Sequence, residues 1–104
     1  MNVYLCTVPA EHAQKIAETL VNEEIAACVN LIAPVTSVYR WKGAVETASE
    51  VLLVVKTRAV LLPALNRRLR ELHPYEVFEL LALPVVGGHR PYLQWVEDET
   101  RASE

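Results

Sequence analysis

The sequence has 104 residues, of which 52% are hydrophobic and 22% charged, and its formal net charge is −3. A chain of this length can bury an ordinary core, so we expect a single globular domain over residues 1–104. The acidic balance disfavours a general nucleic-acid binder. Two cysteines cannot form a secreted disulfide framework, and no apolar run reaches the ~18 residues of a membrane-spanning helix. We therefore expect a cytoplasmic protein with reduced thiols that binds neither nucleic acid nor a membrane.

The first expected elements are a strand and a helix. Asn2 to Val8 is rich in β-forming residues and stops at Pro9, which predicts a strand. After Pro9, apolar residues recur at the spacing of one helical face, which predicts a helix packed on a sheet. These apolar residues are Ala13, Ile16, Ala17, Leu20 and Val21.

A long hairpin is expected next. Cys28 to Trp41 predicts a second strand, and Pro34 places it at a sheet edge or a bulge, because proline removes a ladder donor. A turn at Lys42-Gly43 leads into a third strand from Ala44 to Lys56. Within it, Val51 to Val55 is apolar without alternation, which is typical of a central strand covered on both faces by helices or by other subunits.

The last third of the chain predicts a helix, a strand and a short helix. The first helix begins near Val60 and ends before His73-Pro74. A fourth strand follows from Glu76 to Pro84, and Pro91 opens the last helix. The polar residues from Thr100 to Glu104 are expected to fray. The apolar stripe of the first helix is Leu61, Leu65, Leu69 and Leu72, and the residues expected to face inward from the last are Tyr92, Trp95 and Val96.

The element order is therefore strand, helix, strand, strand, helix, strand, with one extra C-terminal helix. Split β-α-β units in this order form the ferredoxin-like α+β sandwich. We predict that fold, with a long hairpin between the second and third strands. In it the first and third strands lie centrally and the second and fourth lie at the edges, which agrees with the apolar third strand and the proline of the second.

Motifs of catalytic or nucleotide sites are missing from the sequence. There is no P-loop, Rossmann glycine pattern, nucleophile elbow or Cys-x-x-Cys. Aromatic and ionisable residues gather instead at two element ends. They are Tyr39, Trp41 and Lys42 by the hairpin tip, and His73, Tyr75 and Glu76 between the second helix and the fourth strand.

Segments spread in order over nearly the whole chain resemble the CutA family. They are Ala27-Cys28-Val29-Asn30, Tyr39-Arg40-Trp41-Lys42-Gly43 with Glu50, Lys56-Thr57, His73-Pro74-Tyr75-Glu76-Val77, Ala82-Leu83-Pro84 and Tyr92-Leu93-Gln94-Trp95. Phe78 departs from the pattern, since many members have proline there, and we expect this to change the local strand geometry beside Glu79 but not the fold. The resemblance implies a ferredoxin-like fold, a compact homotrimer, and a link to divalent-cation tolerance with copper binding in some members. It also implies a likeness in fold to the PII signalling proteins, which are trimeric effector-binding regulators.

Three residues are candidate metal ligands. Cys28 opens a strand, where a thiol can bind a soft metal or fill a small buried site. His73 ends a helix, which it can cap in its charged form, or it can bind a metal as neutral imidazole. Glu79 can supply a carboxylate oxygen or simply be solvated. Because Cys28 and His73 are distant in sequence, we expect a site shared between subunits, with modest affinity.

Five further residues are candidates for a pocket or a subunit interface, two settings in which aromatic residues are enriched. They are Tyr39, Trp41, Lys56, Tyr75 and Glu76. Lys56 follows five apolar residues on a central strand, so its ammonium group is expected to reach an edge or a pocket. The other cysteine, Cys6, lies in mid-strand and is expected to fill the core.

The leading functional prediction is a non-enzymatic homotrimer that binds copper or a related divalent cation weakly in the response to metal ions, without an organic cofactor. A trimer would also cover the two sheet edges and a hairpin too apolar for one domain to bury. The alternative is a PII-like module with a small molecule in its subunit clefts, although the lack of a glycine- or arginine-rich phosphate site weighs against a nucleotide. A third reading, an enzyme using Lys56, His73 and Glu76, has no recognisable nucleophile-and-base spacing to support it.

Overall fold

A four-stranded antiparallel sheet organises residues 1–100, the part of the chain that the computed structural model describes. The strands lie in the order β2-β3-β1-β4, so the first and third strands are central, as predicted. In chain order the elements are β1 (Asn2–Val8), α1 (Ala10–Asn22), β2 (Cys28–Trp41), β3 (Ala44–Thr57), a 3-10 turn (Ala59–Leu61), α2 (Leu62–Leu72), β4 (Leu81–Pro84) and α3 (Arg90–Glu99). No helix within residues 1–100 combines the length and the apolarity needed to cross a membrane. The predicted α+β architecture is confirmed.

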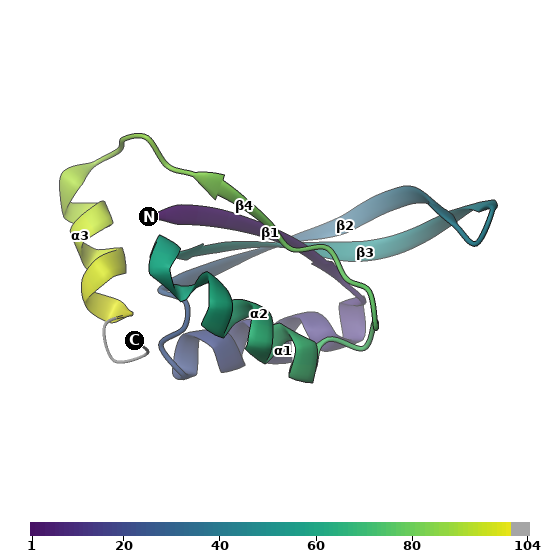
Figure 1. The fold of residues 1–104 in the computed structure, drawn as a ribbon, viewed down its shortest axis with the longest axis horizontal. Helices are drawn as coiled ribbons and strands as arrows, with labels where there is room; N and C mark the ends of the chain where they lie inside the picture. The colour runs from purple at the N-terminus through teal and green to yellow at the C-terminus, as the bar shows by residue number, and fades with distance from the viewer. Residues whose placement is uncertain (101–104) are drawn as a thin grey trace.

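Helices α1 and α2 lie side by side on one face of the sheet (Figure 1). Alternate residues of the two central strands point toward them, so Tyr4, Cys6 and Leu53 are completely buried. The intervening side chains of Leu52 and Val54 remain partly exposed on the opposite face. The continuous apolar run of β3 is therefore covered on one face by this chain, and its second face is open.

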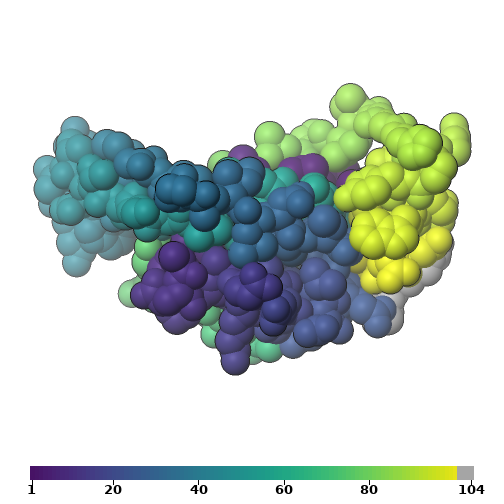
Figure 2. Space-filling model, turned by 180° about the vertical axis from the view of Figure 1, so that it is seen from behind, coloured from purple at the N-terminus to yellow at the C-terminus, as the bar shows by residue number. Residues whose placement is uncertain are grey.

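The hairpin of β2 and β3 extends far beyond the helices as a two-stranded arm, which we define as residues 35–50 (Figures 1 and 2). Its register shifts between Ile32 and Val35, so the bulge predicted at Pro34 is confirmed. Lys42 and Gly43 close the arm with φ values of 49° and 83°, the left-handed geometry that suits a two-residue hairpin turn.

The predicted fourth strand was wrong at its beginning, because β4 spans only Leu81–Pro84 rather than Glu76 to Pro84. Its pairing with β1 stops at Leu5 opposite Leu81. Two residues further along β1, the carbonyl of Thr7 is bonded to the ring of His73 instead of to β4. The segment 75–80 therefore leaves the sheet.

Helix α3 also differs from expectation. Val96 is fully buried as predicted, but Tyr92 and Trp95 are 38% and 43% exposed within this chain, because the helix buries only one narrow stripe. Thr100, expected to fray, is fully buried. The guanidinium of Arg58 donates to the Thr100 hydroxyl (3.0 Å) and carbonyl (2.7 Å), which anchors the end of α3 to the end of β3. The rest of the expected tail, residues 101–104, lies outside the described part of the chain.

His73 ties the end of α2 to the end of β1. Its ring nitrogen Nε2 lies 2.9 Å from the carbonyl of Thr7, and Nδ1 accepts the backbone N–H of Tyr75 at 3.1 Å. Because a carbonyl only accepts hydrogen bonds, Nε2 carries the proton and the lone pair of Nδ1 is already used. The ring stacks on Phe78 with centroids 4.9 Å apart. The expected position at the helix end is confirmed, but the bonding is that of a neutral imidazole rather than a charged cap.

Replacing Thr100 tests whether its hydrogen bonds with Arg58 stabilise the position of α3. Thr100→Val should lower the free energy of unfolding by about 1–2 kcal/mol, because the guanidinium of Arg58 loses the hydroxyl that accepts a hydrogen bond from its Nε. Thr19→Val is the matched control, since each hydroxyl donates to a carbonyl four residues earlier at 2.8 Å, but only Thr100 meets an arginine. Equal losses in the two variants, measured by urea unfolding, would contradict this role.

Acid should destabilise the protein through His73. Burial, the main cause, lowers the pKa of His73 below its ordinary value. The stability that the neutral ring contributes is therefore complete above the unfolded pKa of about 6.5 and is lost as the pH falls toward the lower folded pKa. In urea unfolding from about pH 7.5 to about pH 5, the parent should lose stability more steeply than His73→Phe, whose ring cannot titrate. Parallel pH profiles would show that His73 does not contribute.

Candidate functional site

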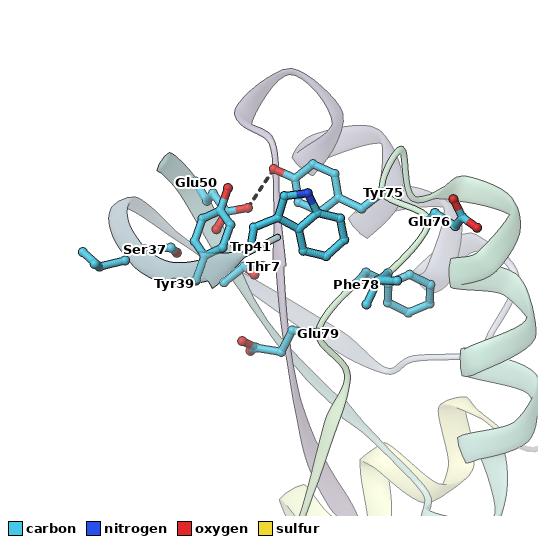
Figure 3. A pocket seen from close by; sticks show the side chains of 11 residues that line it. Thr7, Ser37, Tyr39, Trp41, Glu50, Tyr75, Glu76, Phe78 and Glu79 are labelled. Atoms are coloured by element: carbon cyan, nitrogen blue, oxygen red, sulfur yellow. Dashed lines mark hydrogen bonds between the residues drawn. The ribbon is translucent and has the colours of Figure 1, made fainter. Parts of the chain in front are cut away.

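A pocket of about 790 Å³ lies between the arm and the segment that follows α2 (Figure 3). The arm contributes Tyr39, Trp41 and Glu50 to its lining. The segment after α2 contributes Tyr75, Glu76, Phe78 and Glu79, and Thr7 at the end of β1 completes the wall. Two stretches of chain that were singled out in the sequence thus meet at one cavity.

A buried carboxylate joins the two sides of this pocket. Glu50 is only 6% exposed, and its Oε2 accepts a hydrogen bond from the Tyr75 hydroxyl at 2.9 Å, drawn as a dashed line in Figure 3. Among residues 1–100, no cationic side chain forms a salt bridge with Glu50. A buried carboxylate with one neutral donor and no cationic partner is costly to desolvate and attracts a positive charge.

The negative charges of Glu50 and Glu79 contribute to raised pKa values in neighbouring groups. Burial, the hydrogen bond to Glu50 and the charge of Glu50 raise the pKa of Tyr75 to about 12. Burial, with smaller contributions from the charges of Glu79 and Glu50, raises the pKa of the Cys6 thiol to about 12. Both groups therefore stay protonated and neutral at physiological pH, and Cys6 is a core residue as predicted.

His73 borders the pocket and positions part of its wall. Its ring lies 4.9 Å from the ring of Tyr75 and stacks on Phe78, so two lining residues rest against it. To bind a metal through Nδ1, the imidazole would first have to release the N–H of Tyr75. Phe78, at the position where proline was expected by resemblance, supplies the stacking partner.

Cys28 and Lys56 lie away from this pocket. They pair directly across β2 and β3, and Lys56 is opposite Val3 near the start of β1. His73 contacts Thr7 at the other end of β1. The Lys56 ammonium donates to the side-chain oxygen of Asn30.

Within one chain, then, the predicted metal ligands Cys28 and His73 are not brought together. Glu79 lines the pocket near His73 rather than near Cys28. Nowhere in residues 1–100 do three or more histidine, cysteine or acidic side chains form a ready metal cluster. The structure does place Tyr39, Trp41, Tyr75 and Glu76, four of the five residues expected at a pocket or an interface, in the lining of one cavity.

Sequence reasoning missed Glu50 as a site residue. One signal was present, because Glu50 immediately precedes the apolar run of Val51 to Val55 in a central strand. Its burial depends on the covering segment around Tyr75, which is 25 residues away in the chain, so no local pattern could reveal it.

The charges of the lining indicate what the pocket can bind. Three carboxylates, those of Glu50, Glu76 and Glu79, lie in its wall, and within residues 1–100 no lysine or arginine lines it. Oxygen donors of this kind suit hard or intermediate cations. An anionic ligand would meet only repulsion and a few hydroxyl donors.

Comparisons with known proteins agree on one family. The sequence profile of the family described as "CutA1 divalent ion tolerance protein" matches residues 2–99. Protein CutA of Homo sapiens is 52% identical over 97 residues, covering 92% of this chain and 54% of that protein. The divalent-cation tolerance protein CutA of Thermus thermophilus is 48% identical over 99 residues, covering 94% of this chain and 96% of that protein. The chain thus spans about half the length of the human relative and nearly all of the bacterial one.

Solved structures give the same result. The divalent cation tolerance protein from Thermus thermophilus superposes with a TM-score of 0.93 at 48% identity, covering 95% of this chain and 97% of that one. A structure described as the PII-like protein CutA from Nostoc sp. PCC 7120 in apo form has a TM-score of 0.92 at 42% identity, covering 97% of this chain and 98% of that one. The chain therefore belongs to the family of CutA1 divalent ion tolerance proteins.

Proposed function

We propose that this protein is a non-enzymatic homotrimer that binds copper or a related divalent cation in the response to metal ions, and that the acidic pocket is where the cation is held. The observation that carries the proposal is that Glu50, Glu76 and Glu79 line the pocket without a lysine or arginine among residues 1–100; these carboxylates form no ready cluster, so a cation would have to draw them together. The relatives named for divalent-cation tolerance support it. We propose the cytoplasm as its compartment, where the free thiols of Cys6 and Cys28 stay reduced.

The proposed ligands follow from exposure and position. Glu50 and Glu79 face the same cavity from opposite sides, and both influence the thiol of Cys6 electrostatically. His73 could add a nitrogen ligand, which copper(II) favours, after giving up its bond to Tyr75. Such a site has little dedicated support around its ligands, so we expect modest affinity and little selectivity. Cys28 is at a different place and would serve only copper(I) through a site between subunits.

The trimer is supported by apolar surface that one chain leaves open. On the arm, Val38 and Val45 are 67% and 66% exposed, and every residue of β4 is exposed at the edge of the sheet. Open edges and apolar patches of this kind are usually covered by association. Cyclic association of identical chains would cover them symmetrically.

A second function is favoured by the size and walls of the pocket. A volume of about 790 Å³ exceeds what a single ion needs and falls within the range of small-molecule sites. A solved relative is described as PII-like. We therefore also propose a regulatory module that binds a small molecule at this pocket, and the negative charge of the lining argues against a nucleotide.

Light scattering on the purified protein should give three times the 11.7 kDa mass of one chain. Val45→Asp should dissociate the assembly, because it places a charge on an apolar part of the arm that is 66% exposed in one chain. Asn66→Asp on the exposed side of α2 adds the same charge and should leave the mass unchanged. A parent protein with the mass of one chain would contradict the trimer, and a trimeric Val45→Asp would exclude the arm as its interface.

Titration calorimetry with copper(II) and zinc(II) tests the metal site. Glu50→Gln and Glu79→Gln should each weaken binding about tenfold or more, whereas Glu24→Gln, which removes an exposed carboxylate in the turn after α1, should bind like the parent. Each variant is first checked for its assembly state. Unchanged binding in both lining variants would place the ion elsewhere. Loss in Cys28→Ser alone, and only under reducing conditions, would identify thiolate-bound copper(I) instead.

A further inference from the structure

The walls of the pocket are aromatic, a feature that a bare metal ion does not use. The rings of Tyr39, Trp41 and Tyr75 all line it and are 44%, 48% and 39% exposed within one chain, whereas Glu50 is 6% exposed. In Figure 3 the Glu50 carboxylate lies between the ring of Tyr39 and the hydroxyl of Tyr75. Within one chain the rings of Tyr39 and Tyr75 thus face the cavity, and the buried carboxylate of Glu50 is bonded to Tyr75 beside them.

Aromatic faces and a buried carboxylate attract the same chemical group. The π-face of an aromatic ring attracts a cation with low hydration, and quaternary ammonium groups are bound by cages of such rings. One cation–π contact already exists at the rim, where the Lys42 ammonium lies 5.8 Å from the centroid of the Trp41 ring. Hydrated divalent metal ions, by contrast, bind through oxygen ligands and gain little from surrounding rings.

The buried charge also lacks a counterion inside the described chain. Glu50 receives one hydrogen bond, from the neutral hydroxyl of Tyr75, and forms no salt bridge with any residue in the range 1–100. The nearby thiol of Cys6 stays protonated, so it cannot compensate the charge and does not add to it. A ligand that carries one positive charge on an apolar body would neutralise Glu50 and at the same time fill the aromatic part of the cavity.

We propose that the small molecule bound by this pocket is an organic ammonium cation, with its charged head between Tyr39 and Tyr75 and paired with Glu50. This inference rests on the second function proposed above, a pocket that takes a small molecule. The cavity of about 790 Å³ leaves room for a substituent beyond the head group, along the wall that carries Phe78.

The test compares choline with 3,3-dimethylbutan-1-ol, which has the same shape but an uncharged carbon in place of the nitrogen. Calorimetry on the assembled protein in the presence of EDTA removes any contribution from metal ions. Choline should bind, and the neutral alcohol should bind at least about tenfold more weakly, because a desolvated cation–π contact and its carboxylate are lost together. Equal binding of the two probes would overturn the proposal.

Variants then assign the binding to this pocket. Glu50→Gln should weaken choline binding about tenfold or more, whereas Glu24→Gln, in the exposed turn after α1, should not change it. Tyr39→Leu serves as a further variant if Glu50→Gln fails to fold, since it keeps the hydrogen bond between Tyr75 and Glu50. Choline binding that survives in Glu50→Gln and in Tyr39→Leu would overturn the proposal.

The outcomes separate this inference from the metal site. Copper binding without choline binding would reject the organic ammonium and leave the metal function standing. Choline binding without copper binding would support the ammonium site and reject the metal. Absence of both would reject the pocket as a cation site of either kind.

Discussion

The buried carboxylate of Glu50, held by the hydroxyl of Tyr75, is the contact on which the site depends. It connects the base of the arm to the segment after α2, and both segments line the same cavity. His73 makes the contact possible, because its ring binds the carbonyl of Thr7 and the N–H of Tyr75 and so directs Tyr75 toward the arm. The same bonds end the sheet early and leave the cavity open.

The open surfaces of the chain and its acidic pocket are linked through the arm. Trp41 lines the pocket and is 48% exposed, while Val38 and Val45 further expose apolar surface on the same two strands. If neighbouring chains cover the arm, as we propose, the pocket lies at the boundary of that contact. Ligand binding and assembly would then be coupled, because a cation at Glu50 would bias the position of the arm.

The sequence predicted the features that depend on local apolar periodicity or on local backbone sterics. The apolar spacings of α1 and α2, the bulge at Pro34 and the turn at Lys42-Gly43 are present as predicted, except that Val21, expected on the buried face of α1, is 41% exposed. Features that depend on contacts between residues distant in the sequence were not predicted. β4 is short because His73 takes the carbonyl that a strand would pair with, and Thr100 is buried because Arg58 binds it. Glu50 was missed for the same reason, and Cys28 and His73 lie at opposite ends of β1, a relation set by strand register rather than by sequence spacing.

The most direct test of the account is to observe the Glu50 carboxyl carbon itself by NMR, with isotopically labelled glutamate, while a cation is added. If the buried carboxylate is the anionic centre of the pocket, its signal should shift in proportion to occupancy with both choline and zinc(II). The signal of Glu24, exposed in the turn after α1, should stay where it is. A Glu50 signal that does not move while the cation demonstrably binds would contradict the central claim.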